Sequence, residues 1–324
     1  MRVAHYCEFE DVVSGGIRES VRHQRQMLEK RDIEYAVDPE LDADVLHLNL
    51  MGPRSVYYAK RATRRNIPVV IHTHVTAEDF GGSFRFTNLL AGPLRPYLER
   101  AYGLGDLLVC PSRYNRNLIE EYTDVRTAVV TNGVDTSKLD GHESLRSEYL
   151  ERFDLSPPVV FSVGHVIKRK GLEAFVETAR RMPELDFVWF GPLDRSLKGR
   201  STKRLIDSSP ENCTFTGYVD DIRGAYAAGD IFFFPTHEEN EGIALLEAMV
   251  TGTPVVVRDI ETFDWLEAGT HCLKATDGFE EPLEQLRDDS LRDRLGTNAA
   301  DLGSEYALSN VADRLEACYT EVLA

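Results

Sequence analysis

Two glutamates, Glu239 and Glu247, lie in the part of this sequence with the clearest chemistry. Glu239 is in an acidic loop after the apolar run FFFP, and Glu247 is more than one turn into a helix predicted to begin near Gly242. The backbone N–H groups of Gly242, Ile243 and Ala244 would be donors at the positive end of that helix, which suits a diphosphate. Carboxylates accept hydrogen bonds from sugar hydroxyls. The segment therefore predicts a site for a sugar diphosphate; the alternative is a solvated acidic loop in an acid-rich protein.

A basic run follows another predicted strand, PPVVFSVG, which ends at Gly164. Lys170, in the run KRK, could neutralise the charge that develops on a leaving diphosphate. Stabilisation of such charge is usually the largest single contribution to catalysis. The alternative is that KRK only opens the next helix in solvent.

Two histidines, His72 and His74, close the predicted strand IPVVIHTH. We expect His74 to be the catalytic histidine because it ends the strand. We expect His72 to point to the opposite face. A purely structural role is the alternative for either ring.

Residues 80–102, FGGSFRFTNLLAGPLRPYLERAY, mix aromatic and basic side chains. Such a mixture is typical of a segment that dips into a bilayer surface and binds anionic headgroups. The alternative is a core helix with solvated arginines. The residues expected to contact the acceptor or the membrane are Phe80, Phe84, Arg85, Phe86, Arg95 and Arg100.

The elements that must position these residues alternate as strand and helix along the whole chain. Apolar runs such as RVAHY, DVLHLNL and DLLVCPS are separated by helical stretches, and the pattern restarts near residue 150. This alternation predicts parallel sheets covered by helices on both faces. We expect an α/β fold of two Rossmann-like, doubly wound domains, 1–150 and 151–307, with a polar linker at 137–150. A last helix at 308–324 could cross back to the first domain.

Ligands of such sheets bind beyond the carboxyl ends of the strands, so we expect the site in the cleft between the domains.

The composition is that of a globular protein, with 42% hydrophobic and 28% charged residues. The net charge of −17, from 54 acidic and 37 basic residues, argues against a nucleic-acid partner. It also suggests an acidic surface of the kind that suits high salt. The acidic excess lies in residues 105–324, whereas 54–100 are locally basic.

The five cysteines are scattered and none are spaced as C-x-x-C, which favours a reducing cytoplasm over a disulfide framework or a zinc site. No signal peptide or membrane-spanning run is apparent.

Asp42 and Asp44 match a D-x-D metal motif, but they precede a strand and so lie at the end of the sheet opposite to the ligand. We read them as a turn and expect no catalytic metal.

In combination, these segments resemble the retaining family-four glycosyltransferases, which have two Rossmann-like domains in the GT-B fold. The two-glutamate segment carries the resemblance, and the other motifs occur in the family's order. They are SGGI at 14–17, the histidine after IPVVI, NGVD at 132–135, VGHVIKRKG at 163–171 and FTGYV at 215–219. The resemblance spans nearly the whole chain.

The resemblance implies a role for each donor-site residue. Glu247 would accept hydrogen bonds from the ribose of the donor nucleotide, and Glu239 would hold the hydroxyls of the donor sugar. Lys170 would neutralise the leaving diphosphate. Gly15 and Gly16 fit the glycine turn that lets backbone approach that diphosphate.

Other positions of the family's donor site also have counterparts here. His74 aligns with the loop histidine that contacts the donor sugar, and Tyr218 and Val219 lie where backbone contacts the base. The family commonly has arginine directly after the strand-end glycine, whereas this chain has His165. Arg169 or a backbone donor would replace the contact that is lost.

The implied activity is that of a retaining, metal-independent hexosyltransferase with a UDP- or GDP-linked donor and no further cofactor. Retention without an obvious nucleophile implies front-face displacement, in which a diphosphate oxygen accepts the proton of the acceptor hydroxyl. In finer detail, HTHVTAEDF, RKGLEAFVETA and FFFPTHEENEGI resemble the glucosyldiacylglycerol glucosyltransferases. The acceptor would then be a membrane lipid or glycolipid, and the enzyme peripheral on the inner face of the cell membrane. Alternatives are transfer to a polyprenyl-linked oligosaccharide or surface polysaccharide, a nucleotide-sugar 2-epimerase and a non-catalytic nucleotide-sugar binder.

Overall fold

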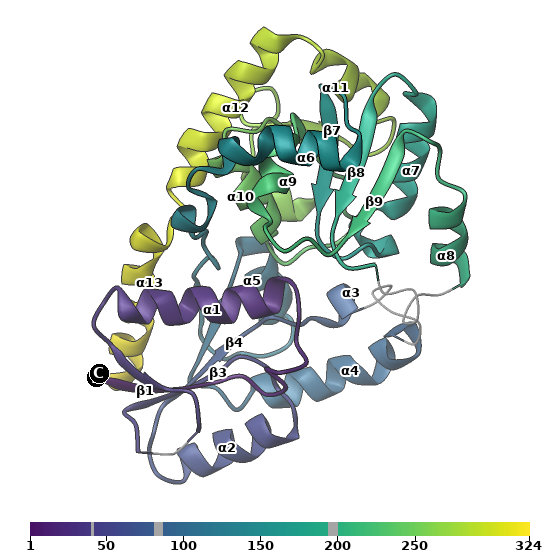
Figure 1. The fold of residues 1–324 in the computed structure, drawn as a ribbon. Coiled ribbons are helices and arrows are strands. Elements are labelled where there is room, and N and C mark those ends of the chain that lie inside the picture. The colour runs from purple at the N-terminus through teal and green to yellow at the C-terminus, as the bar shows by residue number, and fades with distance from the viewer. Residues whose placement is uncertain (40–41, 81–86, 194–199) are drawn as a thin grey trace. The chain divides into compact units, whose positions relative to one another are not determined.

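The structure is a computed structural model that describes residues 1–39, 42–80, 87–193 and 200–324. The chain forms two compact units (Figure 1). The first consists mainly of the chain before Asp135 together with Tyr306–Ala324, and the second of Asp135–Glu305. Each unit is built on its own six-stranded parallel sheet, so the predicted α/β fold of two doubly wound domains is confirmed.

The sheet of the first unit has the strand order β2-β1-β3-β4-β5-β6. Its order reverses between β1 and β3, and such a reversal is where ligands of these sheets bind. The strands are β1 (Arg2–Tyr6), β2 (Glu34–Ala36), β3 (Val45–Leu48), β4 (Val69–His72), β5 (Leu107–Cys110) and β6 (Thr127–Val129). The helices are α1 (Gly16–Glu29), α2 (Pro53–Thr63), α3 (Ala77–Phe80), α4 (Thr87–Tyr102), α5 (Arg113–Glu120) and α13 (Leu308–Leu323).

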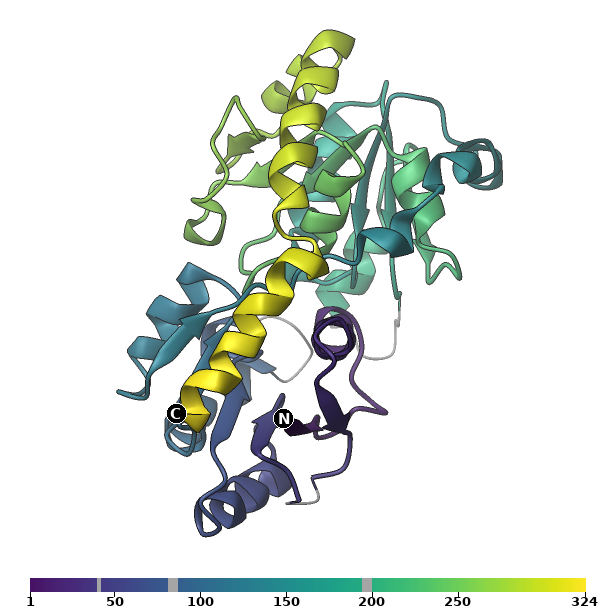
Figure 2. The same ribbon diagram turned by 90° about the vertical axis from the view of Figure 1, so that its left-hand side faces the viewer.

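Helices cover both faces of this first sheet. On one face, Met27 of α1 and Leu315 of α13 pack in a core with Val3 and Val109. On the other face α2, α4 and α5 cover the sheet, and Tyr102 of α4 is among their buried residues. Figure 2 shows α13, in yellow, running along the first sheet. The last helix is therefore part of the first unit although it comes from the end of the chain.

The sheet of the second unit has the order β12-β11-β10-β7-β8-β9, with its reversal between β7 and β10. The strands are β7 (Val159–Val163), β8 (Asp186–Phe190), β9 (Cys213–Gly217), β10 (Ile231–Phe234), β11 (Val255–Arg258) and β12 (Leu273–Ala275). The α-helices are α6 (Arg146–Phe153), α7 (Leu172–Arg181), α8 (Arg200–Asp207), α9 (Arg223–Ala228), α10 (Ile243–Val250), α11 (Glu280–Gln285) and α12 (Asp289–Ser304). Four short 3₁₀ helices are η1 (Thr136–Leu139), η2 (His142–Leu145), η3 (Lys168–Lys170) and η4 (Glu261–Phe263).

Aromatic side chains fill the core of the second unit. Phe175 of α7 packs edge-on against Trp189, with ring centroids 4.9 Å apart, and is stacked with Phe233 at 5.7 Å. Rings of this size bury much apolar area, and their edge-to-face geometry adds to the gain. The central strands are buried on both faces, which is why they read as continuous apolar runs.

The boundary between the units falls after Val134, earlier than the predicted boundary at 150. The stretch expected to be a linker, 137–150, instead holds most of η1, η2 and the start of α6. Tyr149 of α6 is fully buried and donates a hydrogen bond to the carbonyl of Asp221 at 2.5 Å. Gly224 of α9 leaves room for its ring, because a Cβ there would lie 2.2 Å from it. This packing places the segment in the second unit.

None of the helices in the described residues combines the length and the apolar composition needed to cross a bilayer. All five cysteines are buried free thiols.

Candidate active site

In the second unit, Lys170 and Glu239 meet at the carboxyl ends of β7 and β10. These neighbouring strands flank the reversal of strand order, where ligands of doubly wound sheets bind. The Lys170 ammonium contacts the Glu239 carboxylate directly. The structure thus brings together the two residues whose predicted roles concern the leaving diphosphate and the donor sugar.

Further contacts hold the loop of Glu239 against η3. The Arg169 guanidinium donates to the carbonyl of Glu238 at 2.6 Å, and the backbone N–H of His237 donates to the carbonyl of Arg169 at 2.8 Å. The hydroxyl of Thr262 donates to the carbonyl of Glu239 at 2.9 Å. Arg169 lies 4.0 Å from the carboxylate of Glu239, so two cations face this one acidic group.

Gly171 allows this close approach. Its φ of +83° is a conformation that side chains disfavour, and a Cβ would lie 2.2 Å from the carbonyl oxygen of Pro235. Lys170 also lies 5.2 Å from the centre of the Phe234 ring, a favourable cation–π distance.

The Lys170–Glu239 pair is largely withdrawn from water, with side-chain exposures of 17% and 9%. A buried charge is tolerated only when it is paired, and each partner here compensates for the other.

Glu247, in α10, is a second buried carboxylate. The hydroxyl of Tyr226 donates to its Oε2 at 2.6 Å, and the Lys138 ammonium lies 3.6 Å from its Oε1. The sequence analysis did not single out Tyr226 or Lys138. Lys138 follows NGVD by three residues, so its position beside that motif was a usable signal, whereas nothing in the sequence around Tyr226 marks it.

The predicted helix start is close to the observed one. Gly242, with φ of +100°, is the N-cap of α10, which begins at Ile243. As first residues of the helix, Ile243 and Ala244 have backbone N–H groups with no acceptor inside the helix. The contact of these N–H groups with a diphosphate stays a prediction.

The other predicted donor positions follow β7 and β9. His165 is half-buried directly after β7. Tyr218 is 74% exposed and Val219 is buried after β9. In the first unit, Gly15 has φ of +68° and is the N-cap of α1, and a Cβ on Gly16 would meet no atom within 4 Å. The predicted glycine turn is present and uncrowded.

The expectation that His72 and His74 point to opposite faces is wrong. Their rings are stacked, with centroids 4.3 Å apart and planes 15° from parallel. Side chains two residues apart in an extended chain share a face, which is the physical reason. Both rings are buried.

His74 belongs to a cluster of buried imidazoles. His5, His47 and His72 are its other members. Oδ1 of Asn49 accepts a hydrogen bond from Nε2–H of His74 at 2.9 Å, so this nitrogen of His74 carries the proton. Burial lowers the pKa of His74 to about 3 and that of His5 to about 4. These rings are therefore neutral at physiological pH, so His74 can offer a hydrogen bond but not a charge.

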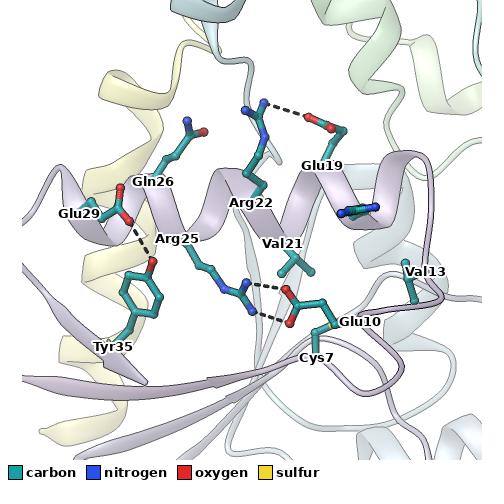
Figure 3. A pocket seen from close by; sticks show the side chains of 11 residues that line it. Cys7, Glu10, Val13, Glu19, Val21, Arg22, Arg25, Gln26, Glu29 and Tyr35 are labelled. Carbon is teal, nitrogen blue, oxygen red and sulfur yellow. Dashed lines mark hydrogen bonds and ion pairs between the residues drawn. The ribbon is translucent and has the colours of Figure 1, made fainter. Parts of the chain in front are cut away.

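A cavity of ≈ 310 Å³ lies beside α1 in the first unit (Figure 3). Its charged groups largely pair with one another, as in the double hydrogen bond of Arg25 to Glu10 at 2.5 and 2.7 Å. Tyr35 donates to Glu29 at 2.9 Å across another part of the wall. None of the site residues predicted from the sequence lines this cavity.

The predicted acceptor or membrane segment is only partly visible. Phe84, Arg85 and Phe86 lie outside the described residues, and so does the side chain of Phe80, which ends α3. Arg95 already forms ion pairs with three carboxylates, and its guanidinium lies 4.7 Å from the centre of the Tyr122 ring. Arg100 is exposed and donates to a carbonyl of its own helix. Arg95 therefore has a structural role in this unit.

The D-x-D pair is accounted for by Arg2. Asp44 accepts from the backbone N–H of Arg2 at 2.8 Å, and Asp42 accepts from its guanidinium at 3.2 Å. Both lie at the amino end of the sheet, opposite to the predicted ligand side. Across the described ranges, no group of three or more acidic, histidine or cysteine side chains is arranged to hold a metal ion.

Known protein families match both units. A model described as glycosyltransferase family 4 matches residues 12–138, and one described as glycosyl transferases group 1 matches 157–289. The processive diacylglycerol alpha-glucosyltransferase of Acholeplasma laidlawii is 33% identical over 333 residues, covering 100% of this chain and 99% of the relative. The alpha-galactosylglucosyldiacylglycerol synthase of Streptococcus pneumoniae is 26% identical over 294 residues, covering 85% of this chain and 75% of the relative.

Solved structures have the same fold at low sequence identity. HepE of Anabaena in complex with UDP and glucose has a TM-score of 0.79 at 16% identity, covering 99% of this chain and 100% of that one. WaaG, a glycosyltransferase involved in lipopolysaccharide biosynthesis, has a TM-score of 0.71 at 15% identity, covering 99% and 100%. With the full-length relative and the two family models, this likeness shows that the chain belongs to the family-four retaining glycosyltransferases of the GT-B fold.

Proposed function

We propose that the protein transfers a hexose from a nucleotide sugar to a hydroxyl of a membrane lipid or glycolipid, with retention of the anomeric configuration. The observation that carries the proposal is the full-length similarity to a diacylglycerol alpha-glucosyltransferase. The similarity to the alpha-galactosylglucosyldiacylglycerol synthase supports the same class of acceptor. HepE binds UDP-glucose, which supports a UDP-linked donor over a GDP-linked one.

The second unit supplies the chemistry at the donor in this proposal. Glu239 accepts hydrogen bonds from the sugar hydroxyls and orients the anomeric carbon, and Lys170 donates to the diphosphate as its bond to the sugar breaks. A diphosphate oxygen accepts the proton of the attacking hydroxyl on the same face of the sugar. Orientation and charge stabilisation then lower the barrier without a covalent intermediate.

The fixed position of Lys170 matters for this step. Its contact with Glu239 holds the ammonium in place before the donor arrives. A hydrogen-bond donor that is already oriented, such as this ammonium, needs no reorganisation when charge develops on the leaving group. The pair therefore supports a reaction in which departure of the diphosphate is the demanding event.

We propose that the surface of α2 contributes to membrane association. Residues 53–77 contain basic but no acidic side chains, in a chain of net charge −17. In the described part of the chain, none of the basic side chains on or just after α2 forms an ion pair. Each basic residue near an anionic leaflet contributes about 1 kcal/mol to binding. These residues are Arg54, Lys60, Arg61, Arg64 and Arg65.

Apolar groups accompany this basic surface. Tyr57 of α2 is 57% exposed. Glu8 accepts from the backbone N–H of Ser55 at 2.8 Å and so ties the loop after β1 to the start of α2. In that loop Phe9 is 57% and Val12 77% exposed. Exposed apolar side chains beside unpaired cations are what a peripheral membrane protein needs.

A product assay tests the proposed activity. The protein would be incubated with radiolabelled UDP-glucose, UDP-galactose or GDP-mannose and a membrane lipid extract. We expect label in the chloroform-soluble fraction, in an α-linked hexose released by α- but not β-glycosidase. Label confined to water-soluble products would contradict the lipid acceptor and favour a polysaccharide acceptor. Label in a polyprenyl-linked product would support that alternative, and conversion of the donor sugar alone would support an epimerase.

A vesicle assay tests the membrane surface separately. The variant with Lys60, Arg61, Arg64 and Arg65 all changed to Gln should lose at least tenfold in binding to phosphatidylglycerol vesicles and keep its activity on a detergent-solubilised acceptor. The control carries four exposed arginines of the second unit changed to Gln, namely Arg180, Arg181, Arg287 and Arg294. Equal loss of vesicle binding in both variants would contradict a role specific to α2.

A further inference from the structure

The carboxylate of Glu247 is held from two sides by residues that come from other elements. Tyr226, in α9, donates to Oε2 at 2.6 Å. Lys138, in η1, approaches Oε1 to 3.6 Å. The exposed fractions of the Glu247 and Lys138 side chains are 9% and 27%, so the ammonium is more accessible than the carboxylate that it faces.

The hydroxyl of Tyr226 has a specific purpose in this arrangement. The ring is buried and packs edge-on against Phe161, with centroids 5.8 Å apart. Phenylalanine would fill the same space, so packing alone does not require the hydroxyl. An O–H group donating to a carboxylate at 2.6 Å makes a strong, charge-assisted hydrogen bond. That bond fixes the orientation of Glu247, whose side chain would otherwise rotate.

Lys138 compensates for the burial of the charge. A carboxylate withdrawn from water is costly unless a cation is near it. At 3.6 Å from Oε1 the ammonium offsets part of the cost of burying the carboxylate, and the distance is longer than a normal hydrogen bond.

We infer that Tyr226 and Lys138 are positioning residues that prepare Glu247 to accept both hydroxyls of the donor's ribose. A carboxylate has about four lone-pair sites and can accept several hydrogen bonds at once, so an oriented carboxylate suits the two hydroxyls of a vicinal diol. The inference rests on the proposed function, because it takes a nucleotide with an intact ribose diol as the ligand.

Calorimetric titrations with UDP and with 2′,3′-dideoxy-UDP test it, because the second ligand lacks the diol. Wild type should bind UDP more tightly than the dideoxy ligand. In Tyr226→Phe, the affinity for UDP should fall about tenfold and the affinity for dideoxy-UDP should stay within twofold. The steady-state counterpart is a higher KM for the nucleotide sugar at nearly unchanged kcat, as expected when uniform binding is lost.

Tyr149→Phe is the matched control. Tyr149 is also a buried tyrosine of the second unit, but its hydroxyl donates to the carbonyl of Asp221. Its removal should change the affinity for both ligands equally, if at all. Lys138→Met should also reduce the preference for UDP over the dideoxy ligand.

The outcomes separate this inference from the proposed function. If wild type prefers UDP over dideoxy-UDP and Tyr226→Phe keeps the full preference, the inference is overturned and the donor site stands. If wild type binds the two ligands equally, Glu247 does not recognise the ribose diol, and the inference is overturned as well. If wild type binds no nucleoside diphosphate, the proposed function itself is wrong.

Discussion

The site residues predicted in the two units lie among different kinds of buried polar group. The first unit buries the cluster of His5, His47, His72 and His74, whose pKa values are all lowered by desolvation, so the rings are neutral. In the second unit the buried carboxylates of Glu239 and Glu247 each lie beside a lysine. Burying a neutral ring costs less than burying an ion, which requires a partner of opposite charge. The difference indicates that the second unit is built to meet charge, as a unit that binds a diphosphate must be.

The largest effect is expected from Glu239→Gln, which removes the charged acceptor for the sugar hydroxyls and the partner of Lys170. We expect kcat to fall by about 10²–10³, the range seen when one oriented group of a catalytic site is lost. The affinity for UDP should stay within threefold, because UDP lacks the sugar. Glu238→Gln, in the same loop, is the control and should remain within threefold of wild type in kcat. Equal effects in the two variants would mean that the pairing with Lys170 has no catalytic value.

A backbone change tests how closely η3 and the loop of Glu239 must approach. Gly171→Ala should destabilise the protein by about 3 kcal/mol or more, because the new Cβ would collide with Pro235 in a strained conformation. Gly16→Ala is the control, since a Cβ there meets nothing and alanine favours helix by up to about 1 kcal/mol. Urea unfolding of both variants measures the contrast, and similar midpoints would contradict the close approach.

The histidine cluster predicts how stability depends on pH. The folded pKa of His5, about 4, lies below the unfolded value of 6.5, so the unfolded state binds a proton first as pH falls. Stability should therefore be complete above pH 6.5 and fall towards pH 5, with His5 alone accounting for about 2 kcal/mol. Urea midpoints at pH 7.5, 6 and 5 check this. His5→Asn should flatten the profile, and a wild-type profile that is already flat would contradict a neutral cluster.

The smallest effect is expected at the D-x-D pair. Asp42→Asn combined with Asp44→Asn should leave kcat/KM within twofold of wild type, because both side chains pair with Arg2 at the amino end of the sheet. Activity should also persist in excess chelator. A large loss of activity in either experiment would indicate that a metal ion takes part in the reaction. It would also argue against Lys170 as the group that neutralises the leaving diphosphate.

The sequence predicted the fold well because apolar strands buried on both faces leave an unambiguous pattern. Glu239, Lys170 and the start of α10 were also predictable, since they lie directly after strands whose carboxyl ends meet. The boundary at Val134 was not predictable from the sequence. It follows from the burial of Tyr149, which depends on contacts with α9, some 75 residues later in the chain. Tyr226 was missed for the same reason: its hydroxyl gains a role only when α9 and α10 pack together.

The histidines show a different limit. The sequence shows which residues are histidines, but it led to a wrong prediction of the strand face on which His72 lies. The stacking of His72 on His74 is seen only in the structure. Arg95 shows a third limit, because two of its three carboxylate partners, Glu78 and Glu121, come from other segments of the chain. Long-range ion pairing is invisible to a local pattern. The expected lipid contact of Arg95 stays a prediction.

The most direct test of the contrast between the units is UDP binding by Lys170→Met and by His74→Asn, each at 50 and 300 mM salt. If the charge that meets the diphosphate lies in the second unit, Lys170→Met should lose at least tenfold in affinity at low salt and depend less on salt than wild type. His74→Asn should match wild type within twofold at both concentrations, since a neutral ring adds no charge. A large loss in His74→Asn together with unchanged binding in Lys170→Met would contradict the account.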